Sequence, residues 1–336
     1  MAEAAGFPRG RHAWERLYDD DEMGETLEPA AAAPPLESPS RSRIRLGEER
    51  AALKVGITIH ATDRAMDPVE LAREAETRGF YSYYIPEHTH IPTSRRTPAP
   101  TGTPILGEEY LRSPDPYVVL AAASAVTETI LLGTGIGLPA QHDAITFAKE
   151  LATLDWLSKG RLVFGIGYGW NHEEMENHGI NVKRRRALVR EKMLAMQALW
   201  ANDVASFDGE FVHFEPSWQW PKPVQQPRPR ILIGGGAGPK LFSHIAEYAD
   251  GWMPIGGAGM AAELQVLRQN LRDNDRDPNE LHVVPMGIFP TEKKLSYYQE
   301  VGVTEAVLRV PSASRDEVLP VLDDFTKYIE RFQAPS

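Results

Sequence analysis

The feature that most constrains the fold is a repeated alternation of short apolar runs and longer amphipathic stretches, which begins at Lys54. The apolar runs lack the polar alternation of a half-exposed strand, which is typical of parallel strands covered on both faces. Strands are expected at residues 54–60, 83–86, 130–136, 161–166, 230–233, 251–255, 282–288 and 304–310. Eight strand–helix units predict an α/β protein with a closed (β/α)8 TIM barrel and insertions, and an open doubly wound sheet is the competing architecture.

Local signals mark where several helices begin. The segment Asp67-Pro68-Val69-Glu70 offers an N-cap, a proline at the first helical position and an acid two positions later. Asp115-Pro116 opens another helix, and Ser314 with Glu317 forms a capping box for the last one. Residues 207–211 predict a hairpin turn, inserted between the fourth and fifth strands.

The first 52 residues differ in composition from the rest of the chain. They carry the acidic run 19–22 and the alanine- and proline-rich run 29–35, with few residues that could form a core. Such a composition rarely offsets the entropy cost of ordering. We therefore expect a disordered extension at 1–52 and a single barrel domain at 53–336.

Composition also limits the function. The formal charge is −11, which argues against nucleic acid as a partner, and no apolar run approaches the length of a membrane span. The absence of cysteine excludes disulfides, thiolate nucleophiles and cysteine-bound metals. The amino terminus lacks the features of a signal peptide, so we expect a cytoplasmic protein.

A glycine-rich stretch follows the fourth strand. Glycines at 165, 167 and 169 would let a flat ligand or a phosphate approach the backbone, although tight packing alone would also explain them. A dinucleotide fingerprint fails here because its third glycine would fall on Trp170, and it fails after the third strand because it would fall on Leu138.

A second glycine-rich loop, residues 234–238, lies between the fifth strand and a helix. The free amides of a helix N-terminus attract anions, so this loop predicts a phosphate site, with a flexible turn as the simpler interpretation. The basic segment 183–186, with Arg190 and Lys192, would meet an anionic cofactor tail or form a solvated helix face.

The ionisable residues Glu87, His88 and His90 directly follow the second strand, at the end where barrels keep their chemistry. An imidazole there can exchange protons near neutral pH, and a structural histidine is the alternative. A metal held by His88 and His90 is disfavoured because the later strand ends supply no further ligands, so no metal site is predicted.

The segment from His172 to Glu176 resembles a zinc-protease helix but lacks the second histidine in register. We interpret its acidic residues as a solvated helix start.

Several segments together resemble the bacterial luciferase-like superfamily, and within it the oxidoreductases that use the deazaflavin coenzyme F420. They are residues 130–136 with Pro139, 161–170, 220–225, 231–236 and 248–252. The resemblance covers about residues 54–333 and implies a barrel with the three-ring cofactor over its carboxyl end.

The resemblance also implies site residues. Glu87 and His88 match a pair near the ring and are the expected catalytic residues, and Gly135-Ile136 matches a non-proline cis peptide bond. The cofactor-binding residues expected from it are His60, Gly135, Ile136, Gly167, Tyr168, Gly169, Trp170, Gly234, Gly235, Gly236, Gly256 and Gly257. Trp170 stands where sugar-phosphate dehydrogenases of this kind have a glutamate, which makes sugar-phosphate oxidation a poorer prediction.

The predicted function is hydride transfer between coenzyme F420 and an unidentified small organic substrate, by a protein that forms a homodimer. The alternatives are an FMN-dependent luciferase-like monooxygenase and a non-catalytic barrel that binds a cofactor.

Overall fold

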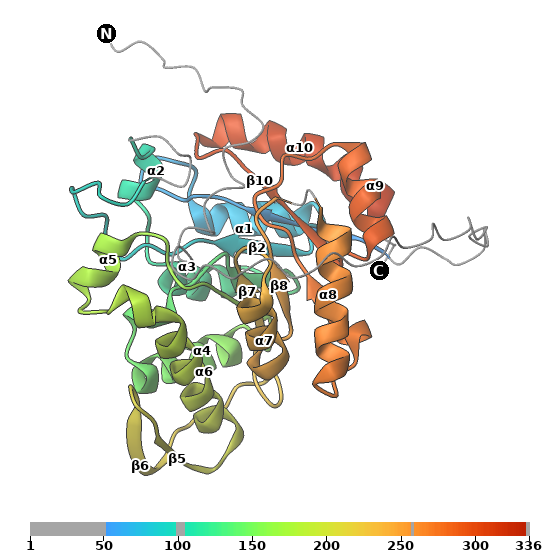
Figure 1. Cartoon of the computed structure of the whole chain (residues 1–336). Helices are drawn as coiled ribbons and strands as arrows, with labels where there is room; N and C mark the ends of the chain where they lie inside the picture. Colours follow the sequence, from blue (N-terminus) through green and yellow to red (C-terminus); the bar gives the residue numbers. More distant parts are fainter. Residues whose placement is uncertain (1–51, 99–104, 257–258, 334–336) are drawn as a thin grey trace, which may run out of the picture.

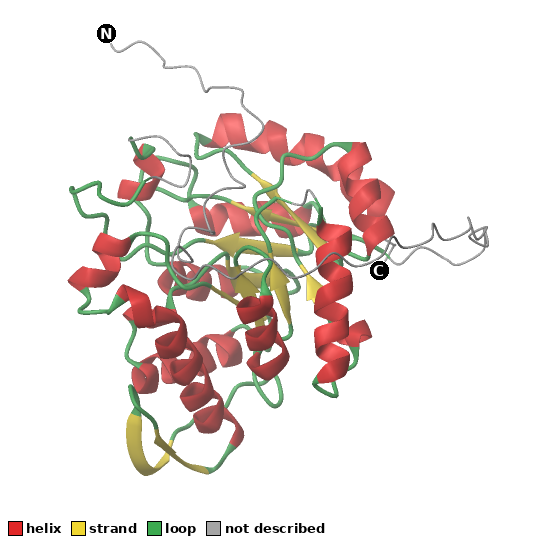
Figure 2. Cartoon of the chain, in the orientation of Figure 1, coloured by secondary structure: helices red, strands yellow, loops and turns green. Residues whose placement is uncertain are grey.

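The computed structural model describes residues 52–98, 105–256 and 259–333. The extension expected at 1–52 lies almost wholly outside these residues, as does Gly257. In Figures 1 and 2 the strands of the large sheet gather at the centre of the molecule, the helices lie around them, and the β5–β6 hairpin (residues 204–218) lies at the lower edge.

Eight parallel strands form the barrel wall, in the order β10-β1-β2-β3-β4-β7-β8-β9. Their bounds are β1 Lys54–Thr58, β2 Ser82–Ile85, β3 Leu131–Thr134, β4 Leu162–Ile166, β7 Arg230–Gly234, β8 Gly251–Met253, β9 His282–Val283 and β10 Glu305–Arg309. Residues after β9 close the sheet onto β10: the amide of Ile288 donates to the carbonyl of Val307 at 2.9 Å, and the amide of Val307 donates to that of Pro285 at 3.0 Å. The (β/α)8 TIM barrel is confirmed.

Helices follow the strands and cover the outside of the barrel (Figure 2). The α-helices are α1 Pro68–Thr77, α2 Glu108–Leu111, α3 Pro116–Ser124, α4 Ala144–Leu157, α5 His172–Asn177, α6 Arg185–Ala201, α7 Pro239–Tyr248, α8 Met260–Asp273, α9 Glu292–Val301 and α10 Arg315–Phe332, and the 3₁₀ helices are η1 Pro139–Gln141, η2 Val182–Arg184 and η3 Pro278–Glu280. The predicted caps are present: Asp67 accepts from the amides of Val69 and Glu70, and Asp115 from that of Val118. The capping box at Ser314 is also formed.

The insertion before β7 is the antiparallel hairpin of β5 (Val204–Asp208) and β6 (His213–Trp218). Several strands are shorter than the sequence predicts, and two of them stop near a proline: β8 ends before Pro254 and β9 before Pro285. Proline has no amide hydrogen and cannot donate to a ladder, so regular pairing stops there.

Two apolar clusters hold the barrel together. The larger one fills the space between the sheet and the helices. The smaller one lies inside the barrel and consists of Tyr84, Val163, Leu232, Met253, Val284, Met286 and Val307. Among the helices of the described residues, none combines the length and apolar character needed to cross a bilayer.

Candidate active site

The carboxyl ends of β3, β4 and β7 converge on the side chain of Ile136. A methyl group built on Gly167 would collide with Ile136 Cδ1, and one on Gly234 would lie 3.0 Å from Ile136 Cγ2. The peptide bond between Gly135 and Ile136 is cis, as the sequence analysis expected. Three predicted cofactor-binding segments therefore meet around one residue.

Two methionines occupy the space beside the glycines of this region. A Cβ on Gly135 would collide with Met286, and one on Gly165 would meet Met253 and the carbonyl oxygen of Thr134. Gly169 has a φ of +80° and contacts Met175. Gly135, Gly165 and Gly169 thus make room for the chain's own side chains and backbone.

The side chain of Glu87 holds the loop after β3 in place. Its side chain is 3% exposed, and it accepts hydrogen bonds from the Leu138 amide at 2.6 Å and the Tyr117 hydroxyl at 3.0 Å. It also lies 2.5 Å from Nε2 of His142. The amide of Glu87 donates to the Ile136 carbonyl at 3.1 Å. Glu87 therefore positions the segment that carries the cis peptide bond.

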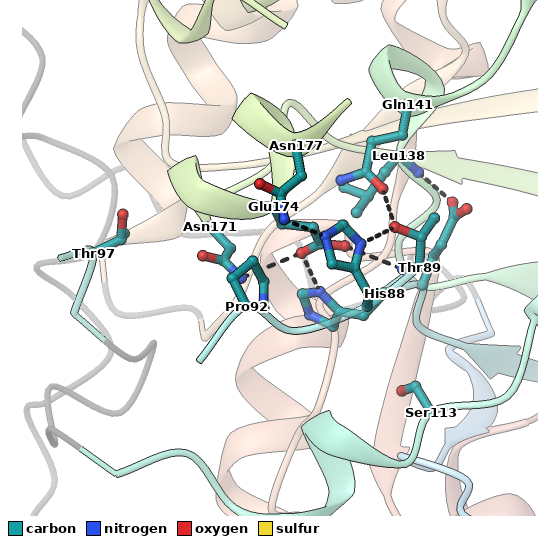
Figure 3. Close-up of polar contacts among 12 residues, drawn as sticks. His88, Thr89, Pro92, Thr97, Ser113, Leu138, Gln141, Asn171, Glu174 and Asn177 are labelled. Carbon is teal, nitrogen blue, oxygen red and sulfur yellow. Dashed lines mark hydrogen bonds and ion pairs between the residues drawn. The ribbon is translucent and has the colours of Figure 1, made fainter. Parts of the chain in front are cut away.

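His88, the next residue, has different surroundings. Its Nδ1 lies 2.8 Å from Oε2 of Glu174, as Figure 3 shows. Its ring packs against Tyr110 at 5.6 Å and against Trp170 at 5.7 Å, the latter edge-on. A cavity of about 180 Å³ lies beside it, lined by Glu87, His88, Thr89, Ser113, Asp115 and Pro116.

His60, at the end of β1, completes an aromatic cluster with His88, Tyr110 and Trp170. Its ring lies 5.1 Å from that of Tyr110. Burial lowers the pKa of His60 to about 3, with smaller contributions from Arg309 and His88. Its Nδ1 is buried and has no hydrogen-bond partner among the residues described. This cluster therefore contains a neutral imidazole with an unused polar atom.

Glu173 and Glu174 were predicted to lie on a solvated helix start, and this prediction is wrong. Their side chains are 2% and 1% exposed. Glu173 accepts from the amide of Thr97 at 3.0 Å, and Glu174 accepts from the amide of Thr89 at 3.1 Å. Both acids bind the long loop after β2. No local pattern in the sequence predicts this contact.

The remaining predicted residues follow β4, β7 and β8. The Tyr168 hydroxyl is 2.6 Å from Nδ1 of His244, and the Arg186 guanidinium lies 4.5 Å from the Tyr168 ring centre. Gly238 is the N-cap of α7, with open space around it. Gly236 is exposed and Gly235 has a φ of +141°.

Several of the basic side chains that were expected to meet an anionic cofactor tail or solvent are paired within the protein. Arg184 pairs with Glu210, and Arg190 with Glu247. Lys192 donates to the carbonyls of Ala140 and His142. Gly256, the last expected site residue within the described part, has a φ of +80° and follows β8.

The family model for luciferase-like monooxygenases matches residues 49–294. The chain belongs to this family. A protein of Mycobacterium tuberculosis described as uncharacterized is 42% identical over 281 residues, which are 83% of this chain and 97% of that protein. An F420-dependent glucose-6-phosphate dehydrogenase of Kineococcus radiotolerans is 28% identical over 167 residues, 48% of each chain.

Solved structures share the fold. An F420-dependent secondary alcohol dehydrogenase in complex with an F420-acetone adduct matches with a TM-score of 0.67 and 18% identity, over 84% of this chain and 99% of the other. The oxygenating constituent of a Pseudomonas putida diketocamphane monooxygenase, in complex with FMN, matches with a TM-score of 0.55 and 18% identity over 74% of each chain. These matches show the fold, and both cofactors are represented among the solved structures that share it.

Proposed function

We propose that this protein transfers a hydride between coenzyme F420 and a small organic substrate at the carboxyl end of the barrel. The observation that carries the proposal is the meeting of the β3, β4 and β7 ends at Ile136, next to the cis peptide bond. His88 of the aromatic cluster directly follows Glu87, and the backbone amide of Glu87 donates a hydrogen bond to the carbonyl of Ile136. The proposed binding surface and the proposed proton-exchanging group would therefore lie at the same end of the fold.

The residues present fit such a cofactor. The buried, unpartnered Nδ1 of His60 would accept or donate one hydrogen bond to a polar ring edge. The loop at residues 234–238 leads into α7, whose first amides would hold a phosphate. Gly236 lies within that loop and leaves the backbone accessible.

The cofactor would supply the hydride chemistry, and the protein would supply positioning and proton transfer. His88 is the residue proposed to exchange a proton with the substrate. Its imidazole can ionise, and the carboxylate of Glu174 holds that ring in place. Glu87 would act indirectly, by positioning the loop after β3 to which it is hydrogen-bonded. Tyr110 and Trp170 would exclude water from the reacting groups.

F420 is preferred over FMN because a sequence relative at 28% identity is described as F420-dependent. The fold match with the F420-dependent alcohol dehydrogenase also covers more of the chain than the match with the FMN-containing monooxygenase. FMN-dependent oxygenation is the second candidate. We further propose that the protein acts in the cytoplasm, with which its acidic charge and lack of cysteine are consistent, and that it forms a homodimer.

The test is a binding titration of the purified protein with oxidised F420 and with FMN, followed by absorbance and fluorescence. We expect F420 to bind at least about tenfold more tightly, a difference of about 1.4 kcal/mol. Gly236→Asp places a negative charge in the phosphate loop and should weaken binding, whereas Asn279→Asp, on a remote exposed turn, should not. Tighter binding of FMN would favour the monooxygenase, and binding of neither cofactor would refute the proposal.

A further inference from the structure

We infer that Glu174 is a positioning residue that fixes the tautomer of His88, with the ring proton on Nδ1 and Nε2 left to accept a proton. The contact joins Nδ1 of His88 to Oε2 of Glu174 at 2.8 Å (Figure 3). An ionised carboxylate can only accept hydrogen bonds, so the neutral imidazole must donate from Nδ1. The catalytic meaning of this contact rests on the proposed function, but the contact itself needs no cofactor.

The carboxylate of Glu174 is held by donors on both oxygens. Oε1 accepts from the backbone amide of Thr89 at 3.1 Å, and Oε2 also lies 3.4 Å from Nδ2 of Asn171. Burial alone would raise the pKa of Glu174, but the hydrogen bond and charge interaction with His88, together with hydrogen bonds from Gln141 and Thr89, leave that pKa below its ordinary value. Glu174 is therefore an anion with a fixed orientation, as a carboxylate that orients an imidazole must be.

The other ring nitrogen of His88 is left available. Within residues 52–98, 105–256 and 259–333, no hydrogen bond to Nε2 of His88 is present, and the ring is confined by Tyr110 and Trp170. Since the Nδ1 contact fixes both the tautomer and the ring plane, Nε2 can accept the proton that a substrate hydroxyl loses.

The neighbouring Glu173 provides a matched control. It is equally buried and belongs to the same helix, but its contacts are with Thr97 and the amide of Arg96 at 2.5 Å. Removing its charge would loosen the long loop without touching His88. A structural effect of losing any buried acid in α5 would appear in both variants, whereas a tautomer effect would appear only for Glu174.

The experiment measures the ring ¹⁵N shifts of His88 in cofactor-free protein at about pH 8, above the ordinary histidine pKa. One of the ten histidines is assigned as His88 by comparison with His88→Gln. In Glu174→Gln the amide oxygen should stay with the Thr89 amide, so the side-chain NH2 faces Nδ1 and moves the ring proton to Nε2. The protonated and unprotonated ¹⁵N shifts should then exchange, while Glu173→Gln keeps the wild-type pattern.

Three results would overturn the inference: a wild-type His88 with its proton on Nε2, an unchanged pattern in Glu174→Gln, or the same exchange in Glu173→Gln. The first needs only the His88→Gln assignment and no change at Glu174, so it decides the matter even if Glu174→Gln does not fold. Glu174→Asp keeps the charge and should keep the wild-type tautomer.

Turnover separates this inference from the proposed function. In the cofactor-loaded protein, Glu174→Gln should reduce kcat about 10²–10⁴-fold, as a wrong tautomer does in other carboxylate–histidine pairs, with cofactor affinity unchanged. If F420 and FMN both fail to bind, the proposed function falls, yet an exchanged ¹⁵N pattern still establishes the role of Glu174.

Discussion

Each end of the barrel buries a glutamate, and the two residues are in opposite electrostatic situations. At the carboxyl end, Glu174 is 1% exposed and accepts hydrogen bonds from an imidazole and a backbone amide. At the amino end, Glu305 begins β10, is 3% exposed, and contacts the hydroxyls of Ser82 and Tyr84, the latter at 3.5 Å. Burial raises the pKa of Glu305 to about 7, partly offset by Ser82 and Arg230, whereas the pKa of Glu174 is lowered.

This difference shows that burial does not by itself determine the charge of a carboxyl group. Strong, well-placed N–H donors keep Glu174 ionised, while two hydroxyls are too few to do so for Glu305. The carboxyl end therefore maintains a charge that can orient an imidazole. The amino end holds an acid that is largely neutral below pH 7, which suits a role in packing.

The largest effect should come from removing the imidazole that the charged glutamate orients. His88→Ala should reduce turnover by about 10²–10⁴-fold, the usual contribution of a general acid–base group. Cofactor affinity, followed by titration, should remain. Glu305→Gln is the matched change at the opposite end of the barrel and should leave turnover unchanged. An equal loss of turnover in both variants would contradict the difference between the two ends.

The second effect concerns the pH dependence of stability. The carboxyl of Glu305 ionises near 4.5 in the unfolded chain and near 7 in the folded protein, so the folded state binds more protons between these values. The free energy of unfolding should therefore fall as the pH rises through this window and level off above about 7. At about 1.4 kcal/mol per pKa unit, the total is about 3 kcal/mol.

Glu305→Gln should remove this slope. Urea unfolding at several pH values should show the variant more stable than the wild type by about 3 kcal/mol at pH 8, with no difference near pH 4. Parallel stability curves for the two proteins would show that Glu305 is ionised in the folded state, like Glu174.

A smaller effect tests the glycines of the carboxyl end. Gly165→Ala would press a methyl group against the Thr134 carbonyl and Met253, so it should destabilise the cofactor-free protein by about 1–3 kcal/mol. Gly238→Ala, where no atom lies within 4 Å, should change the free energy of unfolding by less than about 0.5 kcal/mol. Equal tolerance would mean that Gly165 is needed for a ligand instead of for packing.

Much of the fold was predictable because its signals are local. The apolar runs gave all eight barrel strands, and Asp67 and Asp115 marked helix starts that the structure confirms. Strand lengths were less predictable: β8 and β9 end early because Pro254 and Pro285 interrupt them. The four-residue helix α2 was missed, since a single turn inside a long loop has no periodicity to detect.

The site was harder to predict because its partners are distant in the chain. His88 and Trp170 were expected from strand ends and resemblance, and the structure brings them into contact. Glu174 lies 86 positions from His88, and Tyr110 reaches the cluster only because the loop after β2 folds back. A run of acids at a helix start is usually solvated, so nothing local distinguished Glu174 from Glu176.

The closure between β9 and β10 has a consequence for motion in the barrel. The other neighbouring strands of the wall pair at least partly through regular ladders, but here irregular backbone around Pro285 and Ile288 carries the hydrogen bonds. Amides of this seam should exchange with solvent sooner than those of β1 or β2, since they do not belong to a regular ladder. Met286 belongs to the seam and its side chain lies against Gly135. Local unfolding of the seam would therefore also loosen the packing around the cis peptide bond.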